Sequence, residues 1–341
     1  MAWSEISTDL FLCFFLCIFV KRFKMINEVR NAVLSVLNKN NYGYISPSDF
    51  NLFAANAQME IYEEYYSSYN KTINAENQRA SGTDYADIES PIAETLETFL
   101  MTDYLAHIGA NIFSIPTLTT VGNDSYYVLK LLCYPTLLAS NSPSSIQAVT
   151  LNDTAATFIS DGVVPGCIVS NLDTGAVATV LTVVSEIKLT LDKNIFTSLT
   201  KEYYAIFSPD VKEADKVSVG KITMLNSSSY TSPSELYPSY TLEGQTIKIY
   251  PNTIDLKGQV QAVYFRYPKV PKWTYISLNN GEPAFDQSQS DYQDFELPNE
   301  DGYKLVTKIL EYCGIAIREM EVTQFGMAQQ QHEQPTFSMQ Q

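Results

Sequence analysis

The sequence has few of the residues on which enzymes most often rely. It contains only 2 histidines in 341 residues, His107 and His332. It has no Gly-x-Ser-x-Gly elbow, no His-Glu-x-x-His pair, no Walker loop and no Gly-x-Gly-x-x-Gly loop. Serine hydrolases, zinc peptidases and nucleotide-binding enzymes usually carry one of these motifs. We therefore expect a protein that is not an enzyme, with no catalytic, cofactor-binding or metal-binding residues.

Paired cysteines are also lacking. The 5 cysteines are odd in number, are scattered along the chain and never form a Cys-x-x-Cys pair; they are Cys13, Cys17, Cys133, Cys167 and Cys313. This distribution predicts neither a disulfide framework nor a zinc site. We expect reduced, buried thiols.

Positive charge is scarce. Lys and Arg total 22 against 38 Asp and Glu, which gives a net charge of −16. The basic residues do not cluster, so the chain lacks the patch that would hold a phosphate backbone, and we expect no sequence-specific binding of nucleic acid. The acidic excess is greatest in residues 40–105, where eleven acids face only Lys71 and Arg79.

The apolar run near the N-terminus is too short to cross a membrane. Leu10 to Val20 would rise about 16 Å as a helix, which is well short of the hydrocarbon core. Acidic residues precede this run and basic residues follow it, which is the reverse of a signal peptide. We expect residues 1–24 to be an extension outside the fold, with Met25 as the physiological start and no membrane association. The alternative is a short membrane or partner anchor.

Residues 25–112 predict an antiparallel helical bundle. Apolar residues at three- and four-residue steps predict one helix from Met25 to Lys39 and another of about five turns after Pro47. Ser46 is the predicted N-cap of the second helix. The Asp49 carboxylate, three residues later, is placed to hydrogen-bond with the cap residue, and Ile45 and Phe50 occupy the hydrophobic-staple positions. Residues 70–90 are polar and predict a loop that carries some helix. A third helix is expected from Ser90 toward His107.

Strand and turn signals dominate the middle of the chain. Residues 113–145 predict a connecting β segment with a strand at 126–134. Residues 146–208 predict an inserted module with strands at 158–169, 176–184, 187–191 and 203–207, and a small antiparallel barrel would close its edges.

Residues 209–326 predict further strands and a C-terminal helix. The strands are expected at 246–250 and 259–267, and the two prolines of segment 268–273 require it to run extended or at an edge. The helix begins at 298–301. The Gln-rich residues 327–341 predict a disordered tail. The fold class is therefore α+β: an N-terminal helical bundle, an inserted barrel-like module, further strands and a C-terminal helix.

A few side chains are candidates for chemistry, each with a plainer alternative. Asp103 and His107 could act as an orienting carboxylate and a base, or they could be a solvated pair near a helix end. Carboxylate groups occur at Glu60, Glu63 and Glu64 and at Asp291, Asp294 and Glu296, and such acids bind a metal or cleave glycosides only if separate segments converge. Trp273 is either an aromatic interface anchor or a packed core residue.

Several short motifs, taken together, resemble virion structural proteins of tailed phages. They are the run from Tyr44 to Phe53, the sequences Phe158 to Val163 and Leu189 to Asp192, and the C-terminal sequences Phe295 to Pro298 and Ile309 to Glu319. The chain from Met25 to about Gly326 is similar to ring proteins in the head-to-tail region of crAss-like phages, which infect Bacteroidetes, and of their marine relatives.

The resemblance implies a non-enzymatic subunit of the virion, made in the host cytoplasm. It implies a homo-oligomeric ring, commonly of twelve subunits, that docks to the portal or to a neighbouring ring or tail protein and surrounds the DNA passage. An acidic channel wall would let DNA pass without adhering. Two alternatives stay open: a bacterial surface or periplasmic adhesin whose β module binds a ligand, and a carbohydrate-active tail protein with two convergent carboxylates.

Overall fold

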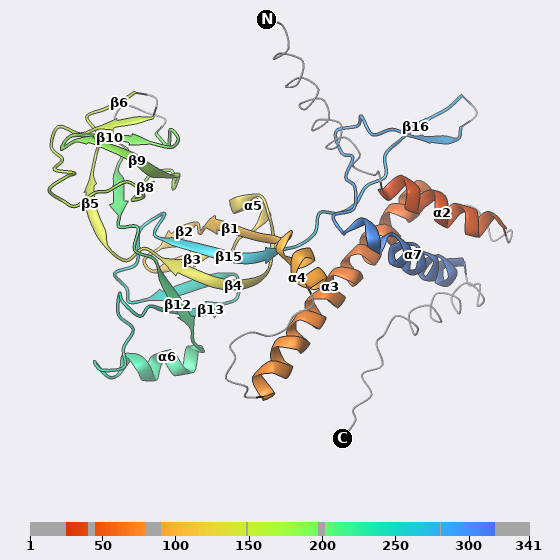
Figure 1. Ribbon diagram of the computed structural model, residues 1–341, viewed down its shortest axis with the longest axis horizontal. Helices are drawn as coiled ribbons and strands as arrows, with labels where there is room; N and C mark the ends of the chain where they lie inside the picture. Colours follow the sequence, from red (N-terminus) through yellow and green to blue (C-terminus); the bar gives the residue numbers. More distant parts are fainter. Residues whose placement is uncertain are drawn as a thin grey trace, which may run out of the picture. The chain divides into compact units, whose positions relative to one another are not determined.

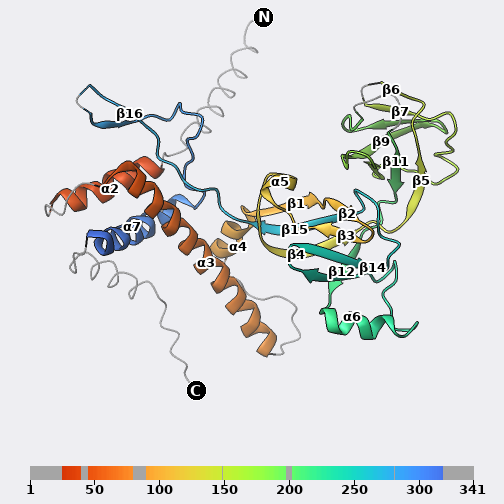
Figure 2. The same ribbon diagram turned by 180° about the vertical axis from the view of Figure 1, so that it is seen from behind.

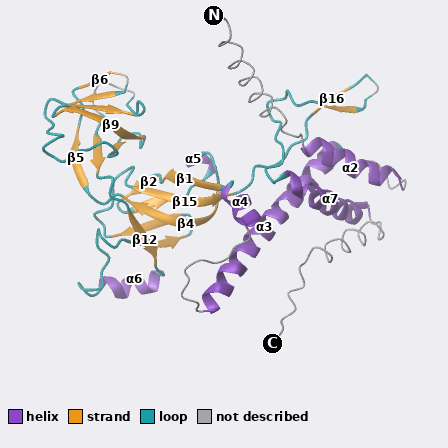
Figure 3. Cartoon of the chain, in the orientation of Figure 1, coloured by secondary structure: helices purple, strands orange, loops and turns teal. Residues whose placement is uncertain are grey.

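The computed structural model describes residues 25–39, 45–79, 90–147, 149–196, 202–279 and 281–317. The chain divides into two compact units. The helical unit runs to Thr98 and resumes at Pro268, and the strand unit comprises Phe99 to Tyr267. Figure 3 shows how unequally helix and strand are shared between them. The expected N-terminal extension and Gln-rich tail lie outside the described residues. Within the described ranges, no helix is long and apolar enough to span a bilayer.

In the helical unit, α7 packs against both α2 and α3 (Figure 1). The elements are α2 (Met25–Lys39), α3 (Pro47–Arg79), α4 (Ser90–Glu97), β16 (Tyr275–Ser277), β17 (Pro283–Phe285), η1 (Asn299–Asp301) and α7 (Gly302–Ile317). The apolar periods predicted from the sequence form the core. Its buried members include Ile26, Val29, Val33, Leu37, Ala54, Ala57, Ile61, Leu305, Ile309 and Leu310.

The N-terminal cap of α3 is formed as the sequence predicts. The Asp49 backbone N–H donates to Ser46 Oγ at 3.1 Å, and Ser46 Oγ donates to Asp49 Oδ2 at 2.7 Å. Ile45 and Phe50 are 6% and 1% exposed. The cap and its two flanking apolar residues therefore fix where α3 begins.

Two helix boundaries differ from the prediction. The third helix was expected to run toward His107, but α4 ends at Glu97 and Leu100–Tyr104 is strand β1, which pairs with residues 261–265 of β15. A helical period in the local sequence cannot reveal a partner strand so far along the chain. Conversely, the second helix was expected to have about five turns, but α3 continues to Arg79, into the segment expected as a loop with some helix, because Ala, Glu, Gln and Arg sustain a helix without an apolar face.

The larger sheet of the strand unit has eight strands in the order β1-β15-β4-β12-β13-β14-β3-β2. The strands are β1 (Leu100–Tyr104), β2 (His107–Gly109), β3 (Ile112–Ser114), β4 (Ser125–Cys133), β12 (Lys212–Lys216), β13 (Ser239–Glu243), β14 (Thr246–Tyr250) and β15 (Val260–Arg266). β1 and β2 lie at opposite ends of this order but are separated in sequence by two residues, so the sheet must curl. Helix α5 (Leu118–Val121) precedes β4.

One connection in this sheet departs from the antiparallel pattern. β12 and β13 pair in parallel, which requires a crossover between them. Helix α6 (Val219–Asn226) and the segment after it supply that crossover, and Ile222 is the buried residue of α6. The strands expected at 126–134, 246–250 and 259–267 are confirmed as β4, β14 and β15.

The smaller sheet has seven strands in the order β5-β11-β8-β9-β10-β7-β6 and is also curled (Figure 1). The strands are β5 (Leu137–Asn141), β6 (Ser145–Gln147), β7 (Thr150–Asn152), β8 (Ile168–Asn171), β9 (Val177–Ser185), β10 (Lys188–Leu191) and β11 (Tyr204–Phe207). Phe158, Leu189 and Ile206 are among its buried core residues. Because β5 pairs with β11, the sheet starts before the residue 146 expected from the sequence.

A strand expected at 158–169 is largely wrong. Residues 158–167 form turns, and β8 begins only at Ile168. Gly162 and Gly166 have φ angles of 79° and 96°, so each reverses the chain where an extended run of apolar residues suggested a strand. The strands expected at 176–184, 187–191 and 203–207 are confirmed as β9, β10 and β11 with small shifts at their ends.

The two sheets join through a small apolar cluster and one close backbone approach. Tyr134 of the larger sheet and Phe207 of the smaller belong to the cluster. At Gly258 a Cβ atom would lie 2.4 Å from Ser170 Oγ and 2.9 Å from Val177 Cγ2. Gly258 also has a φ of 76°, so only glycine fits there without strain. The backbone at Gly258 therefore lies directly against Ser170 and Val177, with no room for a side chain between the two sheets.

Candidate interaction surfaces

Asp103 and His107 are not brought together as a catalytic pair. Asp103 accepts a hydrogen bond from Tyr264 Oη at 2.8 Å, and His107 Nε2 lies 2.6 Å from the Ala110 carbonyl oxygen. The His107 ring packs edge-on against Phe113. Burial, and then the bond to Asp103, raise the pKa of Tyr264. Both side chains thus have structural partners within the strand unit. They lie in strands, and not near the end of a helix as the sequence suggested.

The first carboxylate group forms a charged cluster between α3 and α7. Lys308 Nζ lies 2.8 Å from Glu60 Oε1 and 2.8 Å from Glu64 Oε1, while its own side chain is 4% exposed. Tyr312 Oη donates to Glu60 Oε2 at 3.1 Å. One buried cation thus bridges these two carboxylates and balances one of their two negative charges. Glu63 is exposed.

The second carboxylate group spreads along the extended segment and does not converge. Asp291 pairs with Lys272 at 2.5 Å, and Glu296 Oε2 accepts from the Lys269 backbone N–H at 2.7 Å. Asp294 caps α2 from a distant part of the chain, accepting from the backbone N–H of Ile26 at 2.9 Å. Across the described ranges, no group of three or more His, Cys, Asp or Glu could hold a metal ion.

Three of the five cysteines lie in the described residues, and all three are buried free thiols, as predicted. They are Cys133, Cys167 and Cys313. Burial raises the pKa of the Cys133 and Cys313 thiols to about 12. These two groups are therefore protonated at neutral pH and are poor nucleophiles.

Trp273 is a packed residue and not an exposed anchor. Its side chain is 2% exposed, and the guanidinium of Arg30 lies 3.8 Å from the ring centroid. The indole N–H donates to Asn27 Oδ1 at 3.1 Å. Tyr275 and Phe285 stack on the ring at centroid distances of 5.6 and 6.0 Å. Trp273 thus ties α2 to the base of the β16–β17 hairpin.

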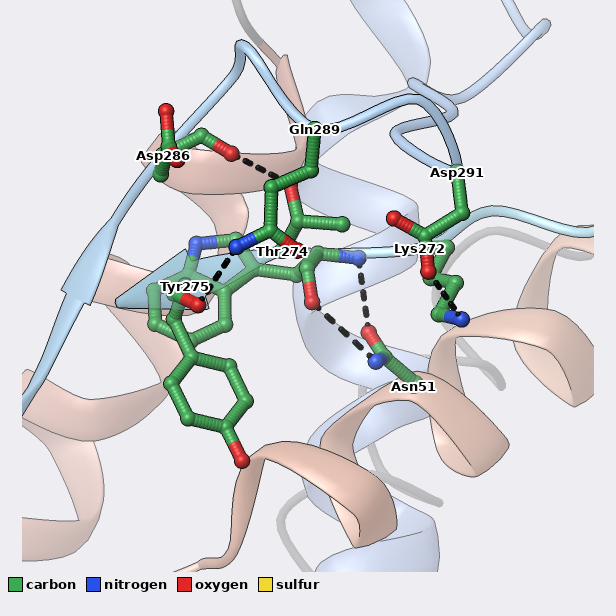
Figure 4. A network of polar contacts seen from close by, with 8 residues as sticks. Asn51, Lys272, Thr274, Tyr275, Asp286, Gln289 and Asp291 are labelled. Carbon is green, nitrogen blue, oxygen red and sulfur yellow. Dashed lines mark hydrogen bonds and ion pairs between the residues drawn. The ribbon is translucent and has the colours of Figure 1, made fainter. Parts of the chain in front are cut away.

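A polar network fixes the base of this hairpin (Figure 4). Thr274 Oγ1 donates to the Asp286 carbonyl, and Gln289 Nε2 donates to the Tyr275 carbonyl at 2.8 Å. On the other side, the Lys272–Asp291 ion pair closes the base. The side-chain hydrogen bond from Lys272 is the largest cause that lowers the pKa of Asp291. These contacts therefore fix where the hairpin begins and ends within the helical unit.

Two amide side chains that the sequence analysis missed bind the extended segment to α3. Asn51 accepts from the Trp273 backbone N–H at 2.8 Å and donates to the Trp273 carbonyl at 3.2 Å. Gln58 donates to the Lys269 carbonyl at 2.8 Å and accepts from the Glu296 N–H at 3.1 Å. Both fall at seven-residue spacing within the apolar period of α3. Polar residues inside an apolar stripe are the signal that could have revealed them.

Beyond its base, the hairpin exposes apolar side chains. We define the hairpin arm as residues 275–285, which comprise β16, β17 and their turn. Tyr275, Ile276 and Leu278 are 41%, 51% and 47% exposed. Figures 1 and 2 both show the arm extending away from α2 and α7. A two-stranded sheet alone is marginally stable in water, and this one pairs with no third strand among the described residues. The arm is therefore suited to packing against another protein surface.

The strand unit carries two further groups of exposed apolar residues. One is the α6 crossover, where Met224, Tyr230 and Tyr237 are exposed. The other is the smaller sheet and its turns, where Leu181 and Val184 of β9 and the turn residues Ile159, Val164 and Ile187 are exposed. Contiguous exposed apolar surface marks interaction sites. The hairpin arm, the α6 crossover and the smaller sheet with its turns thus each carry several exposed large apolar residues.

Comparison with protein-family models finds no match for this chain. Comparison with curated proteins finds no matching protein either.

Proposed function

We propose that this protein is a non-enzymatic structural subunit that assembles with copies of itself. The observation that carries the proposal is the hairpin arm: an isolated two-stranded sheet with exposed apolar side chains, standing on a base fixed by Trp273, Asn51 and the Lys272–Asp291 pair. A base held by so many contacts keeps the arm in one geometry. Preorganisation of this kind lowers the entropic cost of binding.

The setting we propose is a ring in the head-to-tail connector or tail region of a tailed bacteriophage, around the DNA passage. Similarity of the motifs to ring proteins of crAss-like phages supports this setting, as does the net charge of −16, which would repel DNA from a channel wall. The ring would contain twelve subunits and would contact the portal or a neighbouring tail protein. In this proposal an N-terminal antiparallel bundle of α2 and α3 packs beside neighbouring subunits.

Negative-stain electron microscopy of the purified chain, alone and mixed with the portal protein, tests the proposal. Closed symmetric rings of uniform diameter are the expected result. A uniform monomer under every buffer condition, with the portal present, would contradict it.

A further inference from the structure

The strand unit contains a pocket that the proposed assembly does not explain. It has a volume of about 380 Å³, within the range of about 300–1,000 Å³ that is typical of small-molecule sites. Its lining comes from the start of β4, the ends of β3, β12, β13 and β15, and the turn before β14. The pairing directions place all of these at one end of the curled sheet. Mouths of curled and closed sheets are common ligand sites.

Tyrosine rings make up much of the pocket wall. Tyr126, Tyr127, Tyr240 and Tyr267 line it. The rings of Tyr126 and Tyr267 are 5.2 Å apart and nearly perpendicular, at 89°, so they present flat surfaces in two directions. Tyr127 and Tyr267 are 41% and 43% exposed, whereas Tyr240 is 4% exposed and belongs to the core beneath. The pocket is thus an open aromatic cleft with a closed floor.

Polar groups that donate and accept hydrogen bonds lie between these rings. Lys216 is a donor, Asp124 an acceptor and Gln245 both, and all three are exposed members of the lining. Burial raises the pKa of Tyr240, so its phenol stays protonated at neutral pH and remains a donor. Aromatic faces and mixed donors and acceptors therefore line the same small volume.

This lining disfavours charged ligands. Lys216 and Asp124 are the charged side chains of the lining and their charges cancel, so an anion meets no net positive field. A cation would compete with the Lys216 ammonium, which already lies 5.9 Å from the centre of the Tyr127 ring. A neutral molecule with apolar ring faces and many hydroxyl groups matches both parts of the wall.

We propose that this pocket binds a neutral pyranose sugar. The C–H faces of the sugar pack on Tyr126 and Tyr267, and its hydroxyl groups exchange hydrogen bonds with Lys216, Asp124 and Gln245. The site lies entirely within the strand unit, and it is independent of the proposed assembly. Binding involves no covalent step and no metal.

Saturation-transfer NMR on the full chain tests the site, with glucose, galactose, mannose, N-acetylglucosamine and maltose as probes and decaproline as the competing class of ligand. We expect transfer to at least one sugar at millimolar concentration. Tyr267→Ala should weaken that binding about tenfold, because it removes a stacking face, and Tyr267→Phe should keep it within about threefold. Lys216→Ala, at an exposed position, should weaken it by about threefold to tenfold.

The matched control is Tyr275→Ala in the hairpin arm, a similarly exposed tyrosine outside the pocket, which should leave sugar binding unchanged. Three results would overturn the site. They are transfer to no sugar, sugar transfer that neither Tyr267→Ala nor Lys216→Ala reduces, and transfer to decaproline alone, which would identify an aromatic groove for extended peptides.

Discussion

The helical unit and the strand unit are organised by different kinds of contact. In the helical unit, side chains of α3 hold a segment more than 200 residues away through hydrogen bonds to its backbone, as Asn51 does with Trp273. In the strand unit, backbone hydrogen-bond ladders and apolar clusters hold distant segments together. The two sheets meet where Gly258 approaches Ser170. The difference indicates that single side chains matter most in the helical unit, whereas backbone fit matters most between the sheets.

Replacing the buried indole of Trp273 is the strongest test of the claim that single side chains hold the helical unit together. Trp273→Ala should lower the free energy of unfolding of the helical unit by about 3–5 kcal/mol, because it opens a cavity and removes both the ring beneath Arg30 and the hydrogen bond to Asn27. Denaturant unfolding followed by circular dichroism measures this loss. Tyr275→Ala, at a 41% exposed position, is the control and should cost less than about 1.5 kcal/mol. Equal effects of the two variants would break the comparison.

A methyl group added at the junction of the two sheets tests the claim that backbone fit matters most there. Gly258→Ala should destabilise the strand unit by about 2–4 kcal/mol, from an unfavourable φ and from the clash with Ser170. Gly244→Ala is the matched control, because its φ of 63° is also positive but no atom lies within 4 Å of the added carbon. Gly244→Ala should show the φ cost alone, about 1–2 kcal/mol. Thermal unfolding of both variants separates the clash from the strain, and identical losses would refute the close packing of the sheets.

The buried cation between α3 and α7 gives a prediction of intermediate size. Lys308→Met should destabilise the helical unit by about 1–3 kcal/mol, because Glu60 and Glu64 then repel each other, although their own exposure limits the effect. Denaturant titration at neutral pH measures this. Lys304→Met, at a 37% exposed lysine in the same helix, is the control, and an equal loss there would remove any special role for Lys308.

The same lysine predicts a dependence on alkaline pH. Burial alone would lower the pKa of Lys308, but the hydrogen bonds that it donates to Glu60 and Glu64 outweigh burial, and the net shift of the pKa is upward from 10.5. A raised pKa in the folded state means that the stabilisation is complete below pH 10.5 and disappears as the pH rises above it. Unfolding measured from pH 9 upward should therefore show a fall that is smaller in Lys308→Met. A fall of the same size in both proteins would contradict this assignment.

The ion pair at the hairpin base should have the smallest effect. Lys272→Met removes a pair whose side chains are 51% and 50% exposed, so water screens the pair and the expected loss is smaller than for any variant above. The pKa of Asp291 is lowered, so this contribution is present at neutral pH and disappears on acidification below 3.8. Hydrogen exchange of the Tyr275 and Phe285 amides would detect local loosening. A global loss as large as that of Trp273→Ala would contradict the account.

The sequence predicts most of the local structure, apart from the turns at 158–167, but it predicts distant contacts poorly. The Ser46 cap, the bounds of α2 and the strand at 246–250 follow from neighbouring residues and are confirmed. Strand β1 was missed because its identity depends on pairing with β15, about 160 residues later. The hairpin base was missed for the same reason, since the amide of Asn51 acquires its role only when Trp273 lies beside it. Asp103 and His107 could be singled out from the sequence, but their separate partners could not.

The most direct test of the central claim is native mass spectrometry of the full chain beside an Ile276→Asp, Leu278→Asp double variant of the hairpin arm. The account predicts a defined cyclic oligomer for the unaltered chain and smaller species for the double variant, with the free energy of unfolding of the helical unit nearly unchanged, because both residues are exposed. Leu52→Asp, at a 59% exposed position of α3 outside the arm, should assemble as the unaltered chain does. A monomer for the unaltered chain at every concentration, or identical oligomers for the double variant, would contradict the claim.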